Sequence, residues 1–199
     1  MKADFNVCVY CGSSSGKNPQ HKEAAAFIGA ELAKNGMTIV YGGGRRGLMG
    51  TLADNALANN GKVIGIIPDY MMTIEAKHEG VSELIIVSDI RTRKKLMEEK
   101  ADAFLVLSGG LGTLDEMFEI MVLKRLKQLN QPIIILNSCG YWDKISELLE
   151  GMNKEGFLYP EDEASFQIAH SEQEVIEILQ EAVRSNIAKN EFILRKKTC

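Results

Sequence analysis

Three turns rich in glycine or serine follow apolar segments and could hold a phosphate group. They span residues 11–16, 42–50 and 108–113. Glycine has no Cβ, so its backbone can adopt positive φ angles and approach a ligand closely. Where such a turn opens a helix, the free amide groups and the positive end of the helix dipole attract an anion. The candidate contacts are Ser13, Gly43, Gly44, Gly47, Gly109, Gly110, Leu111, Gly112 and Thr113.

The spacing of these glycines favours a single phosphate group. Neither long turn has the G-x-x-x-x-G-K-[ST] pattern of a triphosphate-binding loop. The first turn lacks G-x-G-x-x-G with an acidic residue about 20 positions later, which disfavours a dinucleotide. We therefore expect a monophosphate ligand.

Charged residues beside the turns allow two interpretations each. Thr113 and Glu116 have the spacing of a capping box, and spacing alone favours that structural role. Alternatively, the Glu116 carboxylate stabilises positive charge that develops on a sugar when its base departs. The basic run 91–95 either pairs with Glu98 and Glu99 on a solvated face or faces an anion, because cations are unfavourable at a helix N-terminus.

Short apolar runs alternate with longer amphipathic stretches, which is typical of βαβ units. We expect strands at residues 5–10, 37–41, 62–67, 84–88, 103–107 and 132–137, with a weaker one at 166–169. We expect helices at 20–35, 48–60, 91–100, 112–129, 142–153 and 172–185. The tail 189–199 either frays or extends the last helix. The pattern predicts one Rossmann-like, doubly wound α/β domain over residues 1–199. Its mostly parallel sheet of six to seven strands carries helices on both faces, and ligands bind beyond the carboxyl ends of the strands.

Composition narrows the function further. The 199 residues are 45% hydrophobic and carry a net charge of −4. This charge gives the protein no general electrostatic attraction for nucleic acid. Cys8 and Cys11 have C-x-x-C spacing without a second pair, so we expect a buried strand and its exit and no metal site. The sequence shows neither a secretory segment nor a membrane span, and we expect a cytoplasmic protein.

Taken together, the turns resemble those of a known family. Residues 42–50 match G-G-G-x-x-G-L-M-G, and residues 108–116 match P-G-G-x-G-T-x-x-E except at the first position. The chain is similar over about residues 7–160 to the Lonely Guy family, whose members were often labelled lysine decarboxylases. These enzymes hydrolyse the N-glycosidic bond of cytokinin riboside 5′-monophosphates, which releases the free base and ribose 5-phosphate.

The resemblance implies the roles of several residues. Arg93 and Glu116 correspond to the family's catalytic pair. Lys94, residues 110–113 and an acidic residue before the fourth strand, Glu75, would contact the nucleotide. The resemblance also implies a homodimer or higher homo-oligomer that needs no metal or organic cofactor.

The chain departs from the family pattern at three positions. Arg91 stands in place of the His of M-H-x-R-K, Ser108 in place of Pro, and Val122 in place of a Thr found in plant members. These departures bear on which base is preferred. A non-catalytic carrier of a nucleotide or of molybdenum cofactor on the same fold is the alternative function. A pyridoxal phosphate decarboxylase is a third, for which no motif supplies the Schiff-base lysine.

Overall fold

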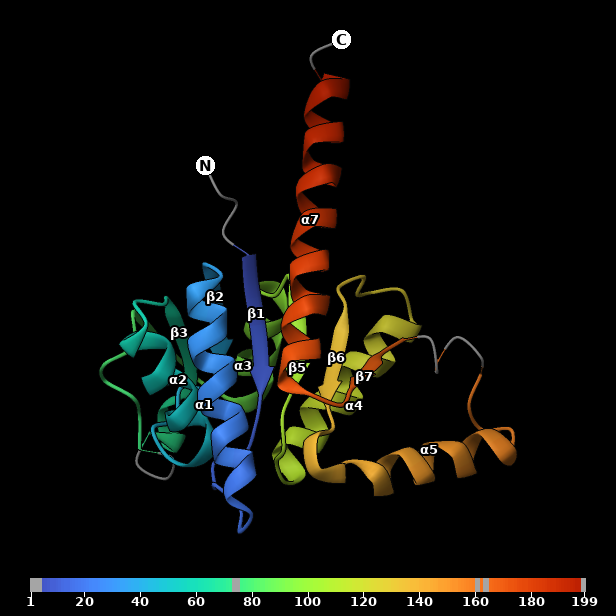
Figure 1. Cartoon of the computed structure of the whole chain (residues 1–199), viewed down its shortest axis with the longest axis horizontal. Coiled ribbons are helices and arrows are strands. Elements are labelled where there is room, and N and C mark those ends of the chain that lie inside the picture. Colours follow the sequence, from blue (N-terminus) through green and yellow to red (C-terminus); the bar gives the residue numbers. More distant parts are fainter. Residues whose placement is uncertain (1–4, 73–75, 160–161, 163–164, 198–199) are drawn as a thin grey trace.

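A computed structural model describes residues 5–72, 76–159, 162 and 165–197 of the chain. Its centre is a seven-stranded sheet in the order β4-β3-β2-β1-β5-β6-β7, and every pairing is parallel (Figure 1). The strands are β1 (Phe5–Tyr10), β2 (Met37–Tyr41), β3 (Val63–Pro68), β4 (Glu83–Val87), β5 (Ala103–Val106), β6 (Ile133–Leu136) and β7 (Gln167–Ala169). The predicted doubly wound α/β fold is confirmed, and the weak seventh strand is present.

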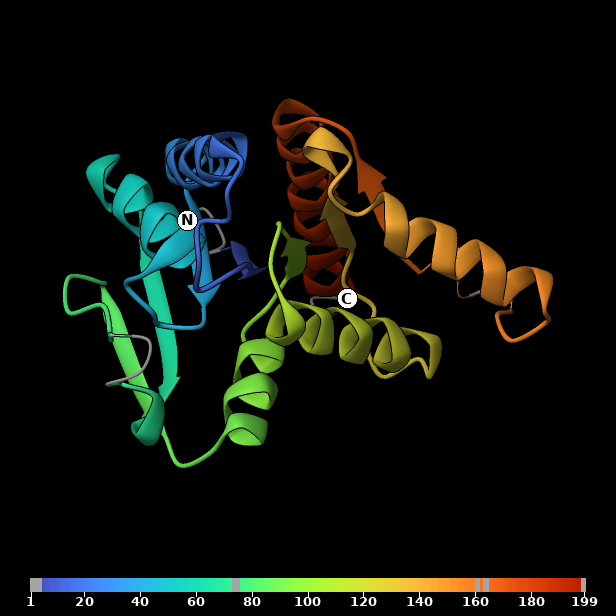
Figure 2. The ribbon, with the colours of Figure 1, turned by 90° about the horizontal axis from the view of Figure 1, so that it is seen from below.

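Helices cover both faces of this sheet. α1 (Pro19–Lys34), α2 (Gly47–Ala58) and α7 (Glu172–Lys197) lie on one side, and α3 (Ile90–Glu99) and α4 (Leu111–Arg125) lie on the other (Figure 2). α5 (Asp143–Lys154) packs against the same core as α3 and α4 through Ile145 and Leu149. Two short 3-10 turns, η1 (Asp69–Met71) and η2 (Ser138–Gly140), complete the connections.

The central strands are buried on both faces, which is why they read as nearly continuous apolar runs. On β1, Cys8 packs into the core beneath α3 and α4. Just past the strand, Cys11 packs into the core beneath α1 and α2. Both are buried, as predicted, and they face opposite sides of the sheet because side chains alternate along a strand.

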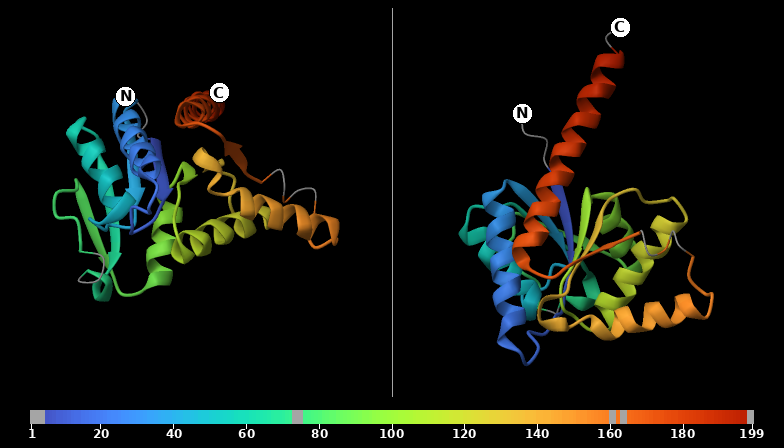
Figure 3. Two further views of the ribbon diagram at one scale, coloured as in Figure 1. Left: turned by 60° about the horizontal axis from the view of Figure 1, so that its bottom comes forward. Right: turned by 45° about the vertical axis from the view of Figure 1, so that its right-hand side comes forward.

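Two helices end at different residues from those predicted. α4 ends at Arg125 rather than near residue 129, because Lys127 has a φ of 58° and reverses the chain. α7 continues to Lys197, so the basic tail extends the last helix. The ribbon of α7 rises past the rest of the fold, on the side away from the turns at the carboxyl ends of the strands (Figure 3).

The sheet reverses its winding at β1, which lies between β2 and β5. In doubly wound folds, ligands bind in the crevice that opens at such a reversal. Here the turns after β1 and β5 touch, since the Gly12 amide donates to the Ser108 carbonyl at 3.0 Å. The fold therefore brings two of the three predicted turns together.

Candidate active site

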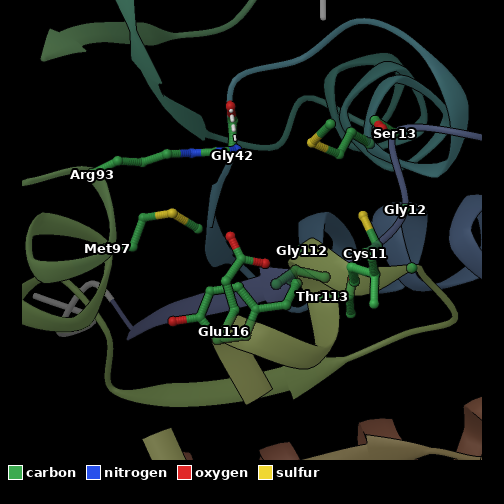
Figure 4. Close-up of a pocket in the computed structure, with 14 residues that line it drawn as sticks. Cys11, Gly12, Ser13, Gly42, Arg93, Met97, Gly112, Thr113 and Glu116 are labelled. Carbon is green, nitrogen blue, oxygen red and sulfur yellow. Dashed lines mark hydrogen bonds between the residues drawn. The ribbon is translucent and has the colours of Figure 1, made fainter. Parts of the chain in front are cut away.

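A pocket of about 170 Å³ lies at the carboxyl ends of β1, β2 and β5. It collects residues from all three predicted turns and from the helices α3 and α4 (Figure 4). Its lining comprises Val9, Tyr10, Cys11, Gly12, Ser13, Gly42, Met49, Arg93, Met97, Gly110, Leu111, Gly112, Thr113 and Glu116.

Arg93 reaches this pocket from α3 and is only 5% exposed. Its Nε donates to the Ile66 carbonyl at 3.1 Å, and its Nη2 donates to the Gly42 carbonyl at 2.9 Å. Ile66 lies within β3 near its carboxyl end, and Gly42 lies just beyond β2, so the guanidinium is fixed against two neighbouring strands. A buried charge held by such hydrogen bonds is a preorganised cation.

Glu116 enters the same pocket from α4, and its carboxylate points into the space on the side where Gly42 and Arg93 lie (Figure 4). The capping-box interpretation is wrong. The N-cap of α4 is Gly110, without a side-chain cap bond, and Thr113 already lies inside the helix. Glu116 therefore lies three residues past Thr113, the position from which a side chain could close a capping box with this N-cap.

The start of α4 provides open backbone next to this carboxylate. A Cβ added at Gly110 or at Gly112 would meet no atom within 4 Å. The first helical bond runs from the Leu114 amide to the Gly110 carbonyl at 3.0 Å, which leaves the amides of residues 111–113 outside the helical ladder. Such amides, at the positive end of a helix dipole, suit an anion.

Ser13 and Leu111 also line the pocket, and Gly109 lines a neighbouring cavity of about 530 Å³. The two cavities share Gly12, Ser13 and Gly110. The predicted contacts of the first and third turns are therefore gathered around one place.

The second glycine turn behaves differently from the prediction. Gly43, Gly44 and Gly47 lie outside the lining of the pocket. The Gly43 carbonyl accepts from the His78 amide at 3.0 Å, and Gly44 forms a bridge with Lys77. Gly47 has a φ of 61°, and a Cβ there would overlap the backbone of Ser13. These glycines let the loops pack closely, and the residues of this turn that line the pocket are Gly42 and Met49.

The basic residues at the start of α3 do not share one role: one faces the pocket, and others pair with acidic side chains. Arg93 faces the pocket, whereas Lys94 binds Asp115 at 2.9 Å and Glu119 at 2.8 Å and lies outside the lining. Burial lowers the pKa of Lys94, but the hydrogen bonds that its ammonium donates to Glu119 and Asp115, with the charges of those carboxylates, outweigh burial and raise the pKa overall. Lys95 and Glu99 form the expected i,i+4 pair at 3.8 Å.

The Asp89 side chain resolves the conflict with the helix dipole. It caps α3 by accepting from the Arg91 and Thr92 amides at 2.9 and 3.0 Å. These bonds, with those from the Thr92 and Ser88 hydroxyls, lower the pKa of Asp89 well below its usual range. The compensating anion that the sequence suggested is thus supplied by the chain itself.

Sequence reasoning missed several pocket residues, chiefly Tyr10, Met49 and Met97. Burial is the main cause that raises the pKa of Tyr10 well above its usual range, and the nearby Cys8 and Glu116 add to it, so the phenol stays protonated. Tyr10 and Met97 lie within elements, and a single sequence gives them no signal beyond core periodicity, whereas Met49 belongs to the matched turn 42–50. Glu75 lies outside the described residues.

Two further features of the described chain bear on its chemistry. Within residues 5–72, 76–159, 162 and 165–197, no three His, Cys, Asp or Glu side chains gather closely enough to hold a metal ion. Over the same ranges, no helix has the length and apolar character needed to cross a membrane.

Several known proteins are similar to this chain. The family model described as "Possible lysine decarboxylase" matches residues 49–179. The cytokinin riboside 5′-monophosphate phosphoribohydrolase of Rhodococcoides fascians is 40% identical over 156 residues, which cover 78% of this chain and 79% of the relative. LOG7 of Arabidopsis thaliana, a protein of the same description, is 38% identical over 88% of this chain and 81% of its own length.

The fold is also shared with a solved structure. The molybdenum cofactor binding protein of Rippkaea orientalis superposes with a TM-score of 0.70 over 92% of this chain and 99% of its own, at 21% identity. Identity at that level shows a common fold and nothing finer. The family model and the phosphoribohydrolase relatives carry the assignment, and the chain belongs to the Lonely Guy family.

Proposed function

We propose that this chain hydrolyses the N-glycosidic bond of nucleoside 5′-monophosphates and releases a free base and ribose 5-phosphate. The observation that carries the proposal is the meeting of Glu116, Arg93 and the open turn 110–113 in one pocket. The relatives described as cytokinin riboside 5′-monophosphate phosphoribohydrolases support the same reaction.

In this mechanism the turn at the start of α4 binds the 5′-phosphate. The amides of residues 111–113 and the Ser13 turn surround the phosphate, and this grip orients the ribose toward Glu116. Arg93, fixed by the Ile66 and Gly42 carbonyls, contacts the ribose or the phosphate from the opposite wall.

The chemical step breaks the bond between C1′ and the base nitrogen. The bonding electron pair leaves with the base, and positive charge develops on the sugar at C1′. The Glu116 carboxylate stabilises that charge and binds the ribose hydroxyls or the attacking water. The water oxygen bonds to C1′, and one proton of the water is transferred to the departing base.

The alternative of a non-catalytic carrier rests on shared fold alone. The molybdenum cofactor binding protein has the same architecture at low identity. A carrier needs the phosphate turn but has no need for a carboxylate beside the sugar. The presence of Glu116 and Arg93 in the pocket therefore favours hydrolysis.

The decarboxylase label carried by the family model has little support in this pocket. A pyridoxal phosphate enzyme needs a lysine that reaches the cofactor aldehyde. No lysine lines the pocket among the residues that the structure describes, and Lys94 is bound to Asp115 and Glu119.

Product analysis tests the proposal directly. AMP and its N6-isopentenyl derivative are each incubated with the purified chain, and the products are separated by chromatography. We expect the free base and ribose 5-phosphate in equal amounts, and the ratio of the two rates gives the preferred base. Adenosine with inorganic phosphate would indicate a phosphatase, and nucleotide recovered intact after long incubation would indicate a carrier.

We further propose that the enzyme is a cytoplasmic homodimer. Cys8 and Cys139 carry free thiols, which suits a reducing compartment. Val122 on α4 is exposed and lines an apolar groove together with Leu149 and Met152 of α5, and large exposed apolar patches mark interaction surfaces. Sedimentation of the wild type and of Val122→Glu tests the dimer, which the charged variant should weaken.

A further inference from the structure

The two residues just before the phosphate turn are held by groups from three separate parts of the fold. Ser108 and Gly109 connect β5 to α4, and a change in their orientation would move the amides of residues 111–113. Glycines give this connection little rigidity of its own. Its shape must therefore come from the contacts that neighbouring elements make with it.

The first contact comes from the turn after β1 and the second from α1. The Gly12 amide donates to the Ser108 carbonyl at 3.0 Å. A hydrogen bond of 2.9 Å joins the Ser108 hydroxyl to Nδ1 of His21, and Ser108 is only 8% exposed. The carbonyl and the hydroxyl of Ser108 are thus both held from the side of β1 and α1.

The third contact comes from the turn after β6. The Tyr141 hydroxyl donates to the Gly109 carbonyl at 2.5 Å. Its ring lies edge-on between His21 and Trp142, with centroid distances of 5.0 and 4.8 Å. Trp142 is buried, so the tyrosine is supported by the core beneath α4.

We propose that His21 and Tyr141 are positioning residues that hold the connection 108–109, and with it the phosphate-binding amides of α4, in the binding-competent orientation. This inference rests on the proposed function, since it assigns the turn to the 5′-phosphate. His21 acts through Ser108, and Tyr141 acts through Gly109. Neither residue touches the reacting atoms.

Ser108 stands where the motif P-G-G-x-G-T-x-x-E has proline, and in this chain the bond from Ser108 to His21 restrains that position. Proline restricts the backbone through its ring. Serine has no such restriction, so the hydroxyl held by His21 supplies the constraint from outside the turn. The pair should therefore behave as one unit.

Binding of ribose 5-phosphate tests the proposal without catalysis, because this product has no glycosidic bond to break. Calorimetric titration compares the wild type with Tyr141→Phe, His21→Phe and Ser108→Ala. Each variant loses one hydrogen bond to the connection, and we expect the Kd to rise about tenfold. The KM for AMP should rise by a similar factor, while kcat falls less than KM rises.

Coupling between the residues gives a second measurement. The double variant His21→Phe with Ser108→Ala should bind as the weaker of its two single variants does, because both lose the same bond. Tyr141→Phe removes a different bond, the one to Gly109, so combining it with Ser108→Ala should weaken binding further than either change alone. Ser108→Thr keeps a hydroxyl and should retain most of the wild-type affinity.

Two control variants remove similar groups far from the turn. Ser82→Ala loses the hydroxyl that accepts from the Val63 amide at 3.0 Å, at the amino end of the sheet. Tyr159→Phe removes a hydroxyl from an exposed tyrosine. Both should bind ribose 5-phosphate as the wild type does, and urea unfolding of all variants separates lost affinity from lost stability.

Three outcomes would overturn the inference. They are wild-type affinity in both Tyr141→Phe and His21→Phe, additive effects of His21→Phe and Ser108→Ala, and a wild type that does not bind ribose 5-phosphate. Tight binding of ribose 5-phosphate without hydrolysis of AMP would instead contradict the proposed function and leave the positioning roles standing.

Discussion

Nη2 of Arg93 lies 2.9 Å from the carbonyl oxygen of Gly42, and this bond joins α3 to the turn that follows β2. A Cβ at residue 42 would overlap the guanidinium, so glycine is required for the contact. The arginine is thus built into the sheet edge, and its charge is in place before a substrate arrives.

Replacement of Arg93 should lower both the activity and the stability of the protein. Arg93→Lys keeps a charge but cannot donate to two carbonyls in the fork geometry of arginine, and we expect kcat to fall by at least about 100-fold. Arg93→Ala leaves the buried Ile66 and Gly42 carbonyls without this donor and should also cost about 1–3 kcal/mol of unfolding free energy. Steady-state kinetics and urea unfolding measure the two effects separately. A fully active Arg93→Ala would show that the arginine serves the fold alone.

Glu116→Gln keeps the size of the side chain and removes its charge. Because the carboxylate stabilises positive charge in the transition state, we expect kcat to fall by about 100- to 1000-fold with little change in unfolding free energy. Glu119→Gln is the control, since its carboxylate binds Lys94 outside the pocket. Near-normal turnover in Glu116→Gln would refute the catalytic assignment.

Two glycine substitutions should separate binding from positioning. Gly112→Ala adds a methyl group to open space in the pocket, so the protein should fold normally while the KM for AMP rises. Gly42→Ala forces the Arg93 guanidinium to move, so kcat should fall more than KM changes. Kinetics with AMP check both variants, and equal effects on KM and kcat in the two would contradict the proposed geometry.

Glu98 should make stability depend on pH. Burial, aided by the charge of Glu119, raises the pKa of Glu98 from 4.5 to about 6 in the folded chain. Between these values the folded state binds the proton more readily than the unfolded state, so stability falls as pH rises through this window. Glu98→Gln removes the penalty and should stabilise the protein at pH 8 by up to about 1 kcal/mol, after allowance for solvent screening.

Thermal unfolding of the wild type and of Glu98→Gln at pH 4.5 and pH 8 measures this difference. We expect the gain to be nearly absent at pH 4.5, where the carboxyl is protonated in the folded state. A gain of equal size at both pH values would show that the charge of Glu98 is not its cause.

The sequence by itself determined the sheet and its turns. Short apolar runs predicted all seven strands, and the central ones stand out because a buried parallel strand needs apolar side chains on both faces. The glycine turns predicted the edge at which the pocket lies, since parallel strands end on the same side. Spacing along the chain gave the wrong prediction where two interpretations fitted it. Thr113 and Glu116 have the spacing of a capping box, but the capping box does not form.

Only the tertiary structure decided which charged residues face the pocket. Arg93 and Lys94 are neighbours in the sequence, yet one lines the pocket and the other binds Asp115 and Glu119 on α4. Successive residues of a helix point about a third of a turn apart, so the packing of α3 against the sheet and α4 assigns their roles. Tertiary packing also decides which glycine of the turn 42–50 faces the pocket. The His78 amide binds the Gly43 carbonyl, whereas Gly42 lines the pocket.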